Sequence, residues 1–203
     1  MSRRPSPPNS PPPVTTVAII GAGPLGRRLA MSAGRSGFCV FLEDVMPATL
    51  SHAREYICEQ LSAEALGSEP GADIRFVSTI EDAVRSAALV IDCVPDELES
   101  KLEILWLLDR MAPPHTVFAT PTVRLSIADL AACTYRPEKC VAIASEPAAL
   151  ANPAANSGPL LLRAAPATAP AALALVADFW RRLGFTPVVE PSSSAEPAAP
   201  TIL

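Results

Sequence analysis

Short apolar runs alternate with longer amphipathic stretches along most of this chain. Apolar runs of about four to eight residues, bounded by turn residues, are typical of buried strands. We expect such strands at residues 17–20, 38–42, 74–77, 89–94, 117–120, 141–144, 160–163 and 186–190. The stretches between them predict helices from residue 24 and at 47–66, 79–86, 97–111, 126–132 and 170–183. Strands that alternate with helices predict an α/β fold on a mostly parallel, doubly wound sheet.

The helical stretches also predict which positions face the core. In the helix at 47–66, apolar residues recur near the helical period at Leu50, Ala53, Ile57 and Leu61. In the helix at 97–111, the positions predicted to point inward are Leu98, Leu102, Leu105 and Leu108. Ser78 or Thr79 is expected to cap the helix at 79–86, because a hydroxyl at that position accepts an N–H group of the first turn.

The two ends of the chain differ in composition from the rest. Residues 1–13 are mainly proline and serine, and residues 191–203 are mainly serine, proline and alanine. Such segments bury too little apolar surface to offset the entropy lost on folding, so we expect both ends to be disordered. A single ordered domain is therefore predicted at 14–190.

Three glycines follow the first predicted strand in the spacing G-x-G-x-x-G, at Gly21, Gly23 and Gly26. Gly21 permits a tight turn, Gly23 lets a pyrophosphate approach the backbone, and Gly26 lets the next helix lie against the strand. Pro24 suits the first turn of that helix, because its missing N–H group is not needed there. The free N–H groups and the positive end of the helix dipole then face the phosphates.

An acidic residue, Asp44, stands at the end of the second predicted strand, 18 residues beyond Gly26. Dinucleotide-binding units carry an acid about 20 residues on, where it accepts hydrogen bonds from ribose hydroxyls. No Arg or Lys follows until Arg54, so no cation is at hand for a 2′-phosphate. The pattern predicts a Rossmann domain that binds NAD rather than NADP. The alternative is an ordinary glycine turn beside a solvated acid.

Composition excludes several other classes of protein. The net charge is −5 with scattered basic residues, and aromatic residues make up 5%, which argues against binding of nucleic acid. No apolar run approaches the roughly 18 residues of a membrane span. The five cysteines form no C-x-x-C pair and no secretion signal precedes the domain, so we expect a reducing cytoplasm.

Several of these stretches together resemble the NAD-binding domain of the L-3-hydroxyacyl-CoA dehydrogenases. The resemblance rests on residues 17–30 (VAIIGAGPLGRRLA), 38–47 (FCVFLEDVMP) and 88–120 (ALVIDCVPDELESKLEILWLLDRMAPPHTVFAT), and it covers about 15–190. It implies an oxidoreductase of fatty-acid metabolism, with NAD as cofactor and acyl-CoA as a partner. The residues that it and the glycine motif assign to the cofactor are Gly21, Gly23, Pro24, Leu25, Gly26, Asp44, Val94, Pro95, Lys101 and Thr122.

The chain differs from that family at the positions of the family's catalytic residues. Val123 stands in place of a serine that holds the substrate oxygen, and Ala144 stands in place of the catalytic histidine. The glutamate that partners this histidine should fall at Asn156, or near Leu161 if the loop shifts. The resemblance therefore predicts no catalytic residue, and an impaired enzyme or pseudoenzyme.

The remaining ionisable residues offer weak substitutes. His52 lies in a helix and His115 at the far end of the sheet from the expected site, so both are expected to be surface residues. Glu146 is the ionisable residue beside the vacated histidine position, either as a base or as a solvated loop acid. Lys101, Asp92 and Asp96 are expected either near the cofactor or in solvent.

The family continues into a helical domain that we do not find in these 203 residues. Two hypotheses remain open, and with them whether the chain is an enzyme. The first is a 3-hydroxyacyl-CoA dehydrogenase-type domain that binds NAD with little turnover. The second is a non-catalytic NAD-binding regulatory or interaction module, paired with a separate chain that supplies the helical domain.

Overall fold

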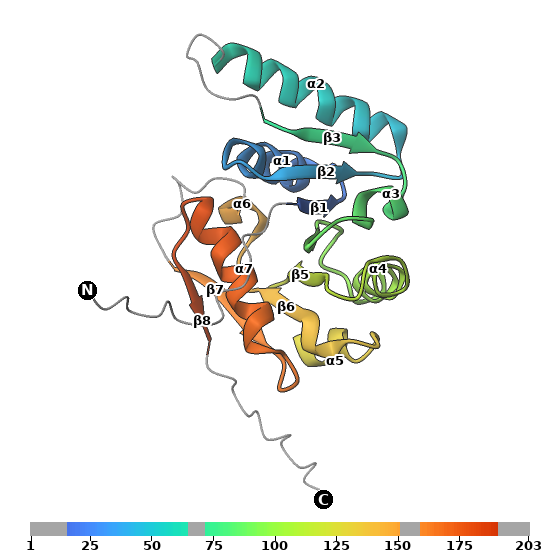
Figure 1. Ribbon diagram of the computed structural model, residues 1–203, viewed down its shortest axis with the longest axis vertical. Helices are drawn as coiled ribbons and strands as arrows, with labels where there is room; N and C mark the ends of the chain where they lie inside the picture. Colours follow the sequence, from blue (N-terminus) through green and yellow to red (C-terminus); the bar gives the residue numbers. More distant parts are fainter. Residues whose placement is uncertain (1–15, 65–71, 151–158, 191–203) are drawn as a thin grey trace, which may run out of the picture.

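The computed structural model describes residues 16–64, 72–150 and 159–190 (Figure 1). The predicted disorder of the two ends, and Asn156 as one candidate position for the glutamate, lie outside the described residues. Within the described residues, no helix is both long and apolar enough to cross a membrane.

The described residues form one eight-stranded sheet with helices on both faces, so the predicted α/β class is confirmed. The strands are β1 (Thr16–Ile20), β2 (Cys39–Glu43), β3 (Ile74–Val77), β4 (Leu89–Asp92), β5 (Val117–Pro121), β6 (Cys140–Ile143), β7 (Leu160–Ala164) and β8 (Pro187–Val189). The helices are α1 (Pro24–Arg35), α2 (Pro47–Glu64), α3 (Ile80–Val84), α4 (Leu98–Met111), α5 (Ile127–Ala131), α6 (Pro147–Leu150) and α7 (Pro170–Arg182). A short 3₁₀ turn at Pro137–Lys139 precedes β6.

The strand order is β3-β2-β1-β4-β5-β6-β7-β8. From β1 the chain adds β2 and β3 on one side, and then adds β4 and all later strands on the other side, so the order of strands reverses between β1 and β4. All neighbouring strands pair in parallel except β6 and β7, which are antiparallel. Ile20 pairs with Glu43 of β2 on one side and with Asp92 of β4 on the other, so these three strands end at the same level. Ligands of such sheets bind outside the carboxyl ends of the strands at the point of reversal. The register therefore brings the glycine loop, Asp44 and the turn after β4 to one place.

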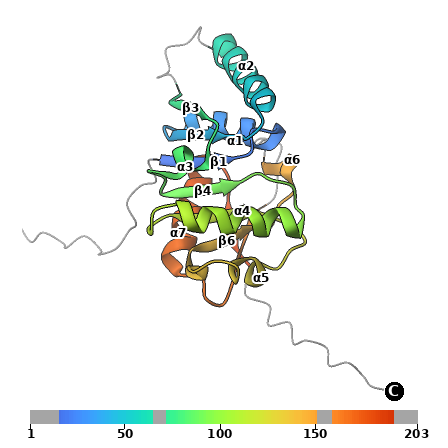
Figure 2. The same ribbon diagram turned by 90° about the vertical axis from the view of Figure 1, so that its right-hand side faces the viewer.

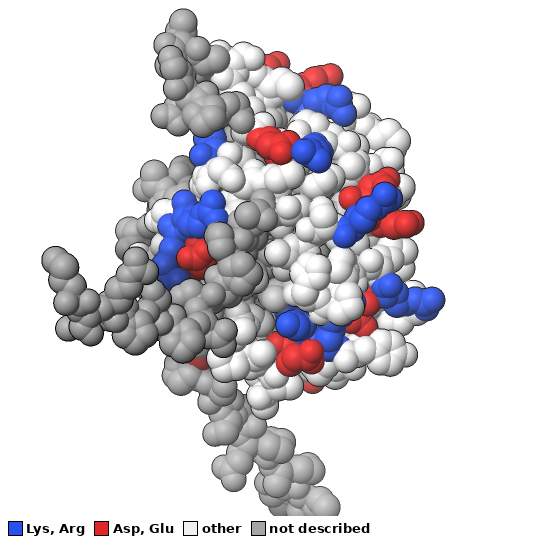
Figure 3. Space-filling model, in the orientation of Figure 1, with Lys and Arg blue, Asp and Glu red and all other residues white. Residues whose placement is uncertain are grey.

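The sheet separates two hydrophobic cores. One contains residues of α1, α2, α6 and α7, and the other contains residues of α3, α4 and α5. Figures 1 and 2 show α4 and α7 on opposite sides of the strands. On the face seen in Figure 3, acidic and basic side chains lie in small mixed groups separated by uncharged surface.

The predicted helix positions are mostly confirmed. Ala53 and Ile57 are buried, and Thr79 Oγ1 accepts the N–H of Asp82 as the N-cap of α3. The prediction that Leu98 points inward is wrong, because its side chain is 49% exposed. Leu98 is the first residue of α4, and the buried residues of the helix start with Lys101.

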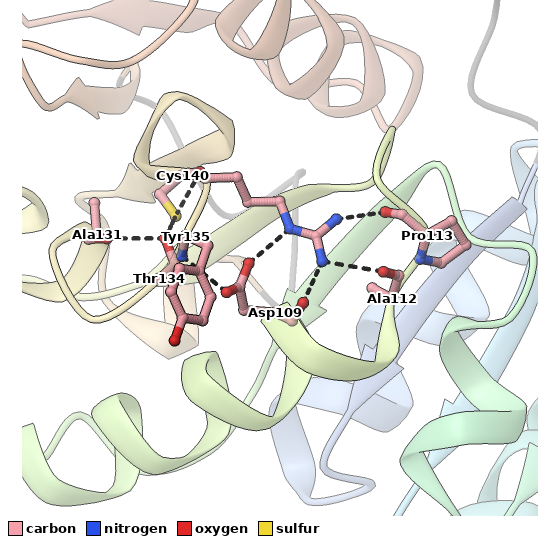
Figure 4. Close-up of polar contacts among 8 residues, drawn as sticks. Asp109, Ala112, Pro113, Ala131, Thr134, Tyr135 and Cys140 are labelled. Atoms are coloured by element: carbon pink, nitrogen blue, oxygen red, sulfur yellow. Dashed lines mark hydrogen bonds and ion pairs between the residues drawn. The ribbon is translucent and has the colours of Figure 1, made fainter.

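Arg136 fastens the end of α4 to the segment before β6 (Figure 4). Its Nε donates to Asp109 Oδ1 at 2.6 Å, and its Nη atoms donate to the carbonyl oxygens of Asp109, Ala112 and Pro113. A planar guanidinium suits this role, because it satisfies several carbonyls that the end of a helix leaves without intrahelical donors. The contact fixes α4 against β5, whose Phe118 ring lies beneath the guanidinium.

Candidate functional site

The glycine loop joins β1 to α1, and each glycine has a distinct structural reason. Gly21 has φ of +98°, a conformation that side chains disfavour, and its N–H donates to the carbonyl of Glu43 at 2.8 Å. A Cβ on Gly26 would lie 1.8 Å from the carbonyl oxygen of Gly21, so only glycine lets the helix approach the loop. Gly23 differs: a Cβ there would meet no protein atom within 4 Å. The space in front of Gly23 is open, as a bound pyrophosphate requires.

The first turn of α1 faces the same space. Gly23 is the N-cap residue and Pro24 occupies the first turn, as predicted. The N–H of Arg27 already donates to the carbonyl of Gly23 at 3.0 Å. The N–H groups of Leu25 and Gly26 have no intrahelical acceptor, because they precede the first helical hydrogen bond. Together with the helix dipole they offer donors to an anion.

Asp44 points toward this loop. Its Oδ2 accepts the N–H of Ala22 at 2.8 Å, and its Oδ1 accepts the N–H of Met46 at 2.8 Å. An ionised carboxylate has about four acceptor positions, so two remain for further donors. The carboxylate thus stands beside the glycine loop with capacity for ribose hydroxyls.

A cavity of about 870 Å³ lies over the carboxyl ends of β1, β2 and β4. It is lined by Ile20, Gly21, Gly23, Pro24, Leu25, Glu43, Asp44, Val45, Thr49, Ile80, Cys93, Val94, Pro95, Asp96, Ser100, Glu103, Ile104, Leu107, Pro121 and Pro147. Among the described residues, no Lys or Arg lines this cavity. The open space at Gly23 and the acid at Asp44 fit a dinucleotide, and the missing cations disfavour one with a 2′-phosphate.

Three predicted cofactor residues lie away from this cavity. Gly26 packs beneath the loop, and Thr122 lines a second cavity of about 390 Å³. Lys101 lines neither cavity: it is fully buried and its Nζ donates to Asp92 Oδ1 at 2.5 Å. The interpretation of Lys101 and Asp92 as solvated residues is therefore wrong. Burial raises the pKa of Asp92, and the charge of Lys101 opposes that rise.

Two acids that line the large cavity were not assigned to the cofactor from the sequence: Glu43 was given no role, and Asp96 was left between a place near the cofactor and one in solvent. Glu43 is buried at the cavity wall, and its burial, together with the neighbouring Asp44 charge, raises its pKa to about 7. Asp96 lines both cavities: its Oδ2 accepts the N–H of Val123 at 3.1 Å, and its buried Oδ1 has no partner among the described residues. The feature of the sequence that could have indicated Glu43 as a site residue is the pair of adjacent acids after the second apolar run.

The positions that vary from the resembling family lie beside the second cavity. Val123, Ser145 and Glu146 line it, whereas Ala144 is buried at the end of β6. The N–H of Ala144 donates to the carbonyl of Leu161 at 2.8 Å, which joins the backbone at the end of β6 to β7.

Neither His52 nor His115 lines either of these two cavities. His52 is exposed on α2, and His115 is exposed in the turn that precedes β5. That turn lies at the amino end of the strand, opposite the edge where the cavities open. Their expected surface positions are confirmed.

Comparison with curated proteins places the chain among dehydrogenases. It is 30% identical over 136 residues to the "Probable 3-hydroxybutyryl-CoA dehydrogenase" of Bacillus subtilis, covering 63% of this chain and 47% of that protein. It is 32% identical over 181 residues to the 5-formyl-3-hydroxy-2-methylpyridine 4-carboxylate 5-dehydrogenase of Mesorhizobium japonicum, covering 87% of this chain and 57% of that protein. The chain thus spans about half the length of these relatives.

Solved structures agree with this placement. A diketoreductase superposes with a TM-score of 0.75 at 28% identity, covering 88% of this chain and 65% of that one. The 3-hydroxybutyryl-CoA dehydrogenase of Escherichia coli gives a TM-score of 0.75 at 27% identity, covering 87% of this chain and 38% of that one. The family described as "3-hydroxyacyl-CoA dehydrogenase, NAD binding domain" matches residues 16–193. The chain therefore belongs to the family of NAD-binding domains of 3-hydroxyacyl-CoA dehydrogenases.

Proposed function

We propose that this chain binds NAD in the large cavity and forms the cofactor-binding part of an oxidoreductase. The observation that carries the proposal is the open space at Gly23, bounded by the first turn of α1 and by Asp44. The N–H groups of that turn bind the pyrophosphate, and Asp44 accepts hydrogen bonds from ribose hydroxyls. Val94 and Pro95 line the same space. When bound, NAD supplies the hydride acceptor for an alcohol substrate.

The charges around the cavity favour NAD over NADP. Asp44 lies where a 2′-phosphate would approach, and like charges repel. Arg54, the first cation along the chain after Asp44, has its guanidinium over the ring of Phe76. It therefore serves the packing of α2 on β3 and does not line the cavity.

We propose in addition that the chain oxidises 3-hydroxyacyl-CoA slowly or not at all. Val123 and Ala144 carry no group that accepts a proton, and neither does Asn156 or Leu161, the two candidate positions for the glutamate. Loss of a positioned base costs roughly 10²–10⁴-fold in rate. Glu146 lines the second cavity and is the remaining candidate for a base at this end of β6.

A second candidate function is a non-catalytic NAD-binding module, that is, a pseudoenzyme. The residues at the family's catalytic positions favour it, because Val123 stands in place of the serine and Ala144 in place of the histidine. Such a module would act with a separate chain that supplies the helical domain and binds acyl-CoA. We place it in the cytoplasm, since all five cysteines are free thiols and a reducing compartment keeps them so.

The cofactor proposal is tested by thermal unfolding with NAD and with NADP. At an NAD concentration 100 times its dissociation constant, the fold should gain about 2.7 kcal/mol, and NADP should give a much smaller gain. Gly23→Val should unfold at the wild-type temperature without ligand, because Gly23 has φ of −63° and open space around it, yet it should lose the NAD response.

Ala174→Val adds the same branched side chain at an exposed position of α7 and serves as the matched control. It should keep the full response to NAD. A wild-type protein whose unfolding temperature ignores NAD would contradict the proposal.

Turnover is tested with acetoacetyl-CoA and NADH by following the absorbance of NADH. We expect NADH binding without measurable oxidation. Turnover that Glu146→Ala abolishes would show instead that the chain is an active dehydrogenase with a glutamate base.

A further inference from the structure

The second cavity opens directly beside the cofactor cavity. The two share three lining residues, Asp96, Pro121 and Pro147. A molecule in the second cavity therefore lies next to whatever occupies the first. Its volume of about 390 Å³ falls at the lower end of the range for small-molecule sites.

The lining of the second cavity is more polar than that of the first. The lining residues that carry polar side chains are Asp96, Thr122, Arg124, Ser145 and Glu146. Arg124 is the sole cation among the described residues that line either cavity. A guanidinium in a cavity is a ready ligand for a carboxylate, which it binds through two parallel N–H groups.

Arg124 keeps most of its donors available. A guanidinium has five N–H donors, and the structure gives Arg124 one long hydrogen bond, from Nη2 to the carbonyl of Asp96 at 3.3 Å. The ion pairs of the described residues do not include Arg124, although Asp96 and Glu146 line the same cavity.

The loop that carries Arg124 is held from three sides. The N–H of Val123 donates to Asp96 Oδ2 at 3.1 Å, and the carbonyl of Val123 accepts Arg163 Nη1 at 3.1 Å. Arg163 is itself fixed by Glu190 at 2.5 Å, and Thr122 Oγ1 accepts the N–H of Leu125. The backbone that positions the guanidinium is therefore set before any ligand arrives.

Asp96, which also lines the second cavity, accepts hydrogen bonds, whereas Arg124 donates them. The Oδ2 of Asp96 accepts one N–H group, from Val123, so the carboxylate has capacity to accept a ligand hydroxyl as well. A molecule that satisfies both sides carries a carboxylate for Arg124 and a hydroxyl for Asp96.

On the basis of the proposed function, we infer that the second cavity binds a small hydroxy acid, with its carboxylate on Arg124, as the substrate of this site. A carboxylate is favoured over a phosphate of coenzyme A as the anion. The phosphates of coenzyme A are separated from the reacting acyl group by the long pantetheine arm, whereas the cavity of Arg124 directly adjoins the cofactor cavity.

Calorimetric titration of the whole chain, with saturating NAD and again without it, tests the inference. The probes are 3-hydroxybutyrate, its neutral amide 3-hydroxybutyramide, and free coenzyme A. The acid should bind about tenfold or more tightly than the amide, since a charge-assisted pair with arginine is lost in the amide. Arg124→Gln should abolish that difference while its thermal response to NAD persists.

Arg181→Gln removes an exposed guanidinium from α7 and should preserve the preference for the acid. Equal binding of acid and amide, no binding of either, or displacement of the acid by coenzyme A would each overturn the inference. A protein that prefers the acid through Arg124 yet ignores NAD would refute the proposed function and leave the acid site standing. A protein that responds to NAD but does not bind the acid would refute the acid site and leave the proposed function standing.

Discussion

Two adjacent carboxyl groups, Glu43 and Asp44, end the second strand in different surroundings. Asp44 accepts two backbone N–H groups, from Ala22 and Met46. Glu43 lies buried beside it, and its pKa is raised to about 7 by burial first and by the Asp44 charge second. The same edge of the cavity therefore holds an acid bound by backbone N–H groups and a second, buried acid whose pKa is raised to about 7.

Glu43 should make the stability of the fold depend on pH. Its ordinary pKa of 4.5 applies to the unfolded chain, so between about pH 4.5 and about pH 7 the unfolded state loses its proton first. The contribution of Glu43 to stability therefore falls as the pH rises through this window. Glu43→Gln removes the titration, so its unfolding temperature relative to wild type should be higher at about pH 8 than at about pH 5.5.

Thermal unfolding at both pH values measures this difference, with Glu59→Gln as the control. Glu59 is exposed on α2, so its variant should shift equally at both pH values. A Glu43→Gln variant whose shift is the same at both would show that Glu43 is not held neutral by its surroundings.

The glycine residues show how far sequence reasoning reaches at single positions. The spacing of Gly21, Gly23 and Gly26 predicted a turn, an open approach and a close packing, and each has its geometric counterpart. Glu43 and Lys101 were not predicted as buried, because burial of an ionisable group depends on what covers it and leaves no periodic signature.

The helix α4 is fixed to the sheet at both ends by ionic groups rather than by leucines alone. At its start Lys101 reaches Asp92 at the end of β4, and near its other end Asp109 pairs with Arg136 at 2.6 Å (Figure 4). Both partners of the first pair are buried, so each compensates a charge that would be costly alone.

Lys101→Met should destabilise the fold by about 3–5 kcal/mol, because it leaves Asp92 buried without its cation. The double variant with Asp92→Asn should recover much of that loss, since no unpaired charge remains. Urea unfolding of both single variants and the double variant gives the coupling energy.

Lys139→Met, in the turn before β6, serves as the control and should cost less than about 1 kcal/mol. Additive effects of the Lys101 and Asp92 substitutions would show that the two charges do not depend on each other.

The order and type of the elements were largely predictable, whereas their exact extents and directions were not. Each apolar run became a strand, and the inner strands β4, β5 and β6 are buried along their whole length, as a strand covered on both faces is. The edge strands β3 and β8 are partly exposed. The antiparallel direction of β7 relative to β6 was not predicted, since the direction of a strand is set by the connection that leads to it and not by its apolar residues. Leu98 is wrong as a core position because it is the first residue of α4 and lies exposed there, and the periodicity does not indicate where the buried part of a helix begins.

The whole domain is one sheet with a core on each face, so both cores should unfold together. Two cysteines report on them separately: Cys93 packs against the first core and Cys140 lies in the second. Burial raises the pKa of the Cys140 thiol to about 12 and that of Cys93, which lines the large cavity, well above its ordinary value, so both should react slowly in the native state.

Pulsed labelling with a thiol reagent across a urea gradient should therefore give the same midpoint for Cys93 and Cys140. Cys58 is exposed on α2 and should react at every urea concentration, which makes it an internal control for the reagent. Saturating NAD should move the midpoints of Cys93 and Cys140 upward together, because a ligand held at one edge of the sheet stabilises the whole cooperative unit. Midpoints that separate, or an upward shift confined to Cys93, would show that the two faces of the sheet unfold independently.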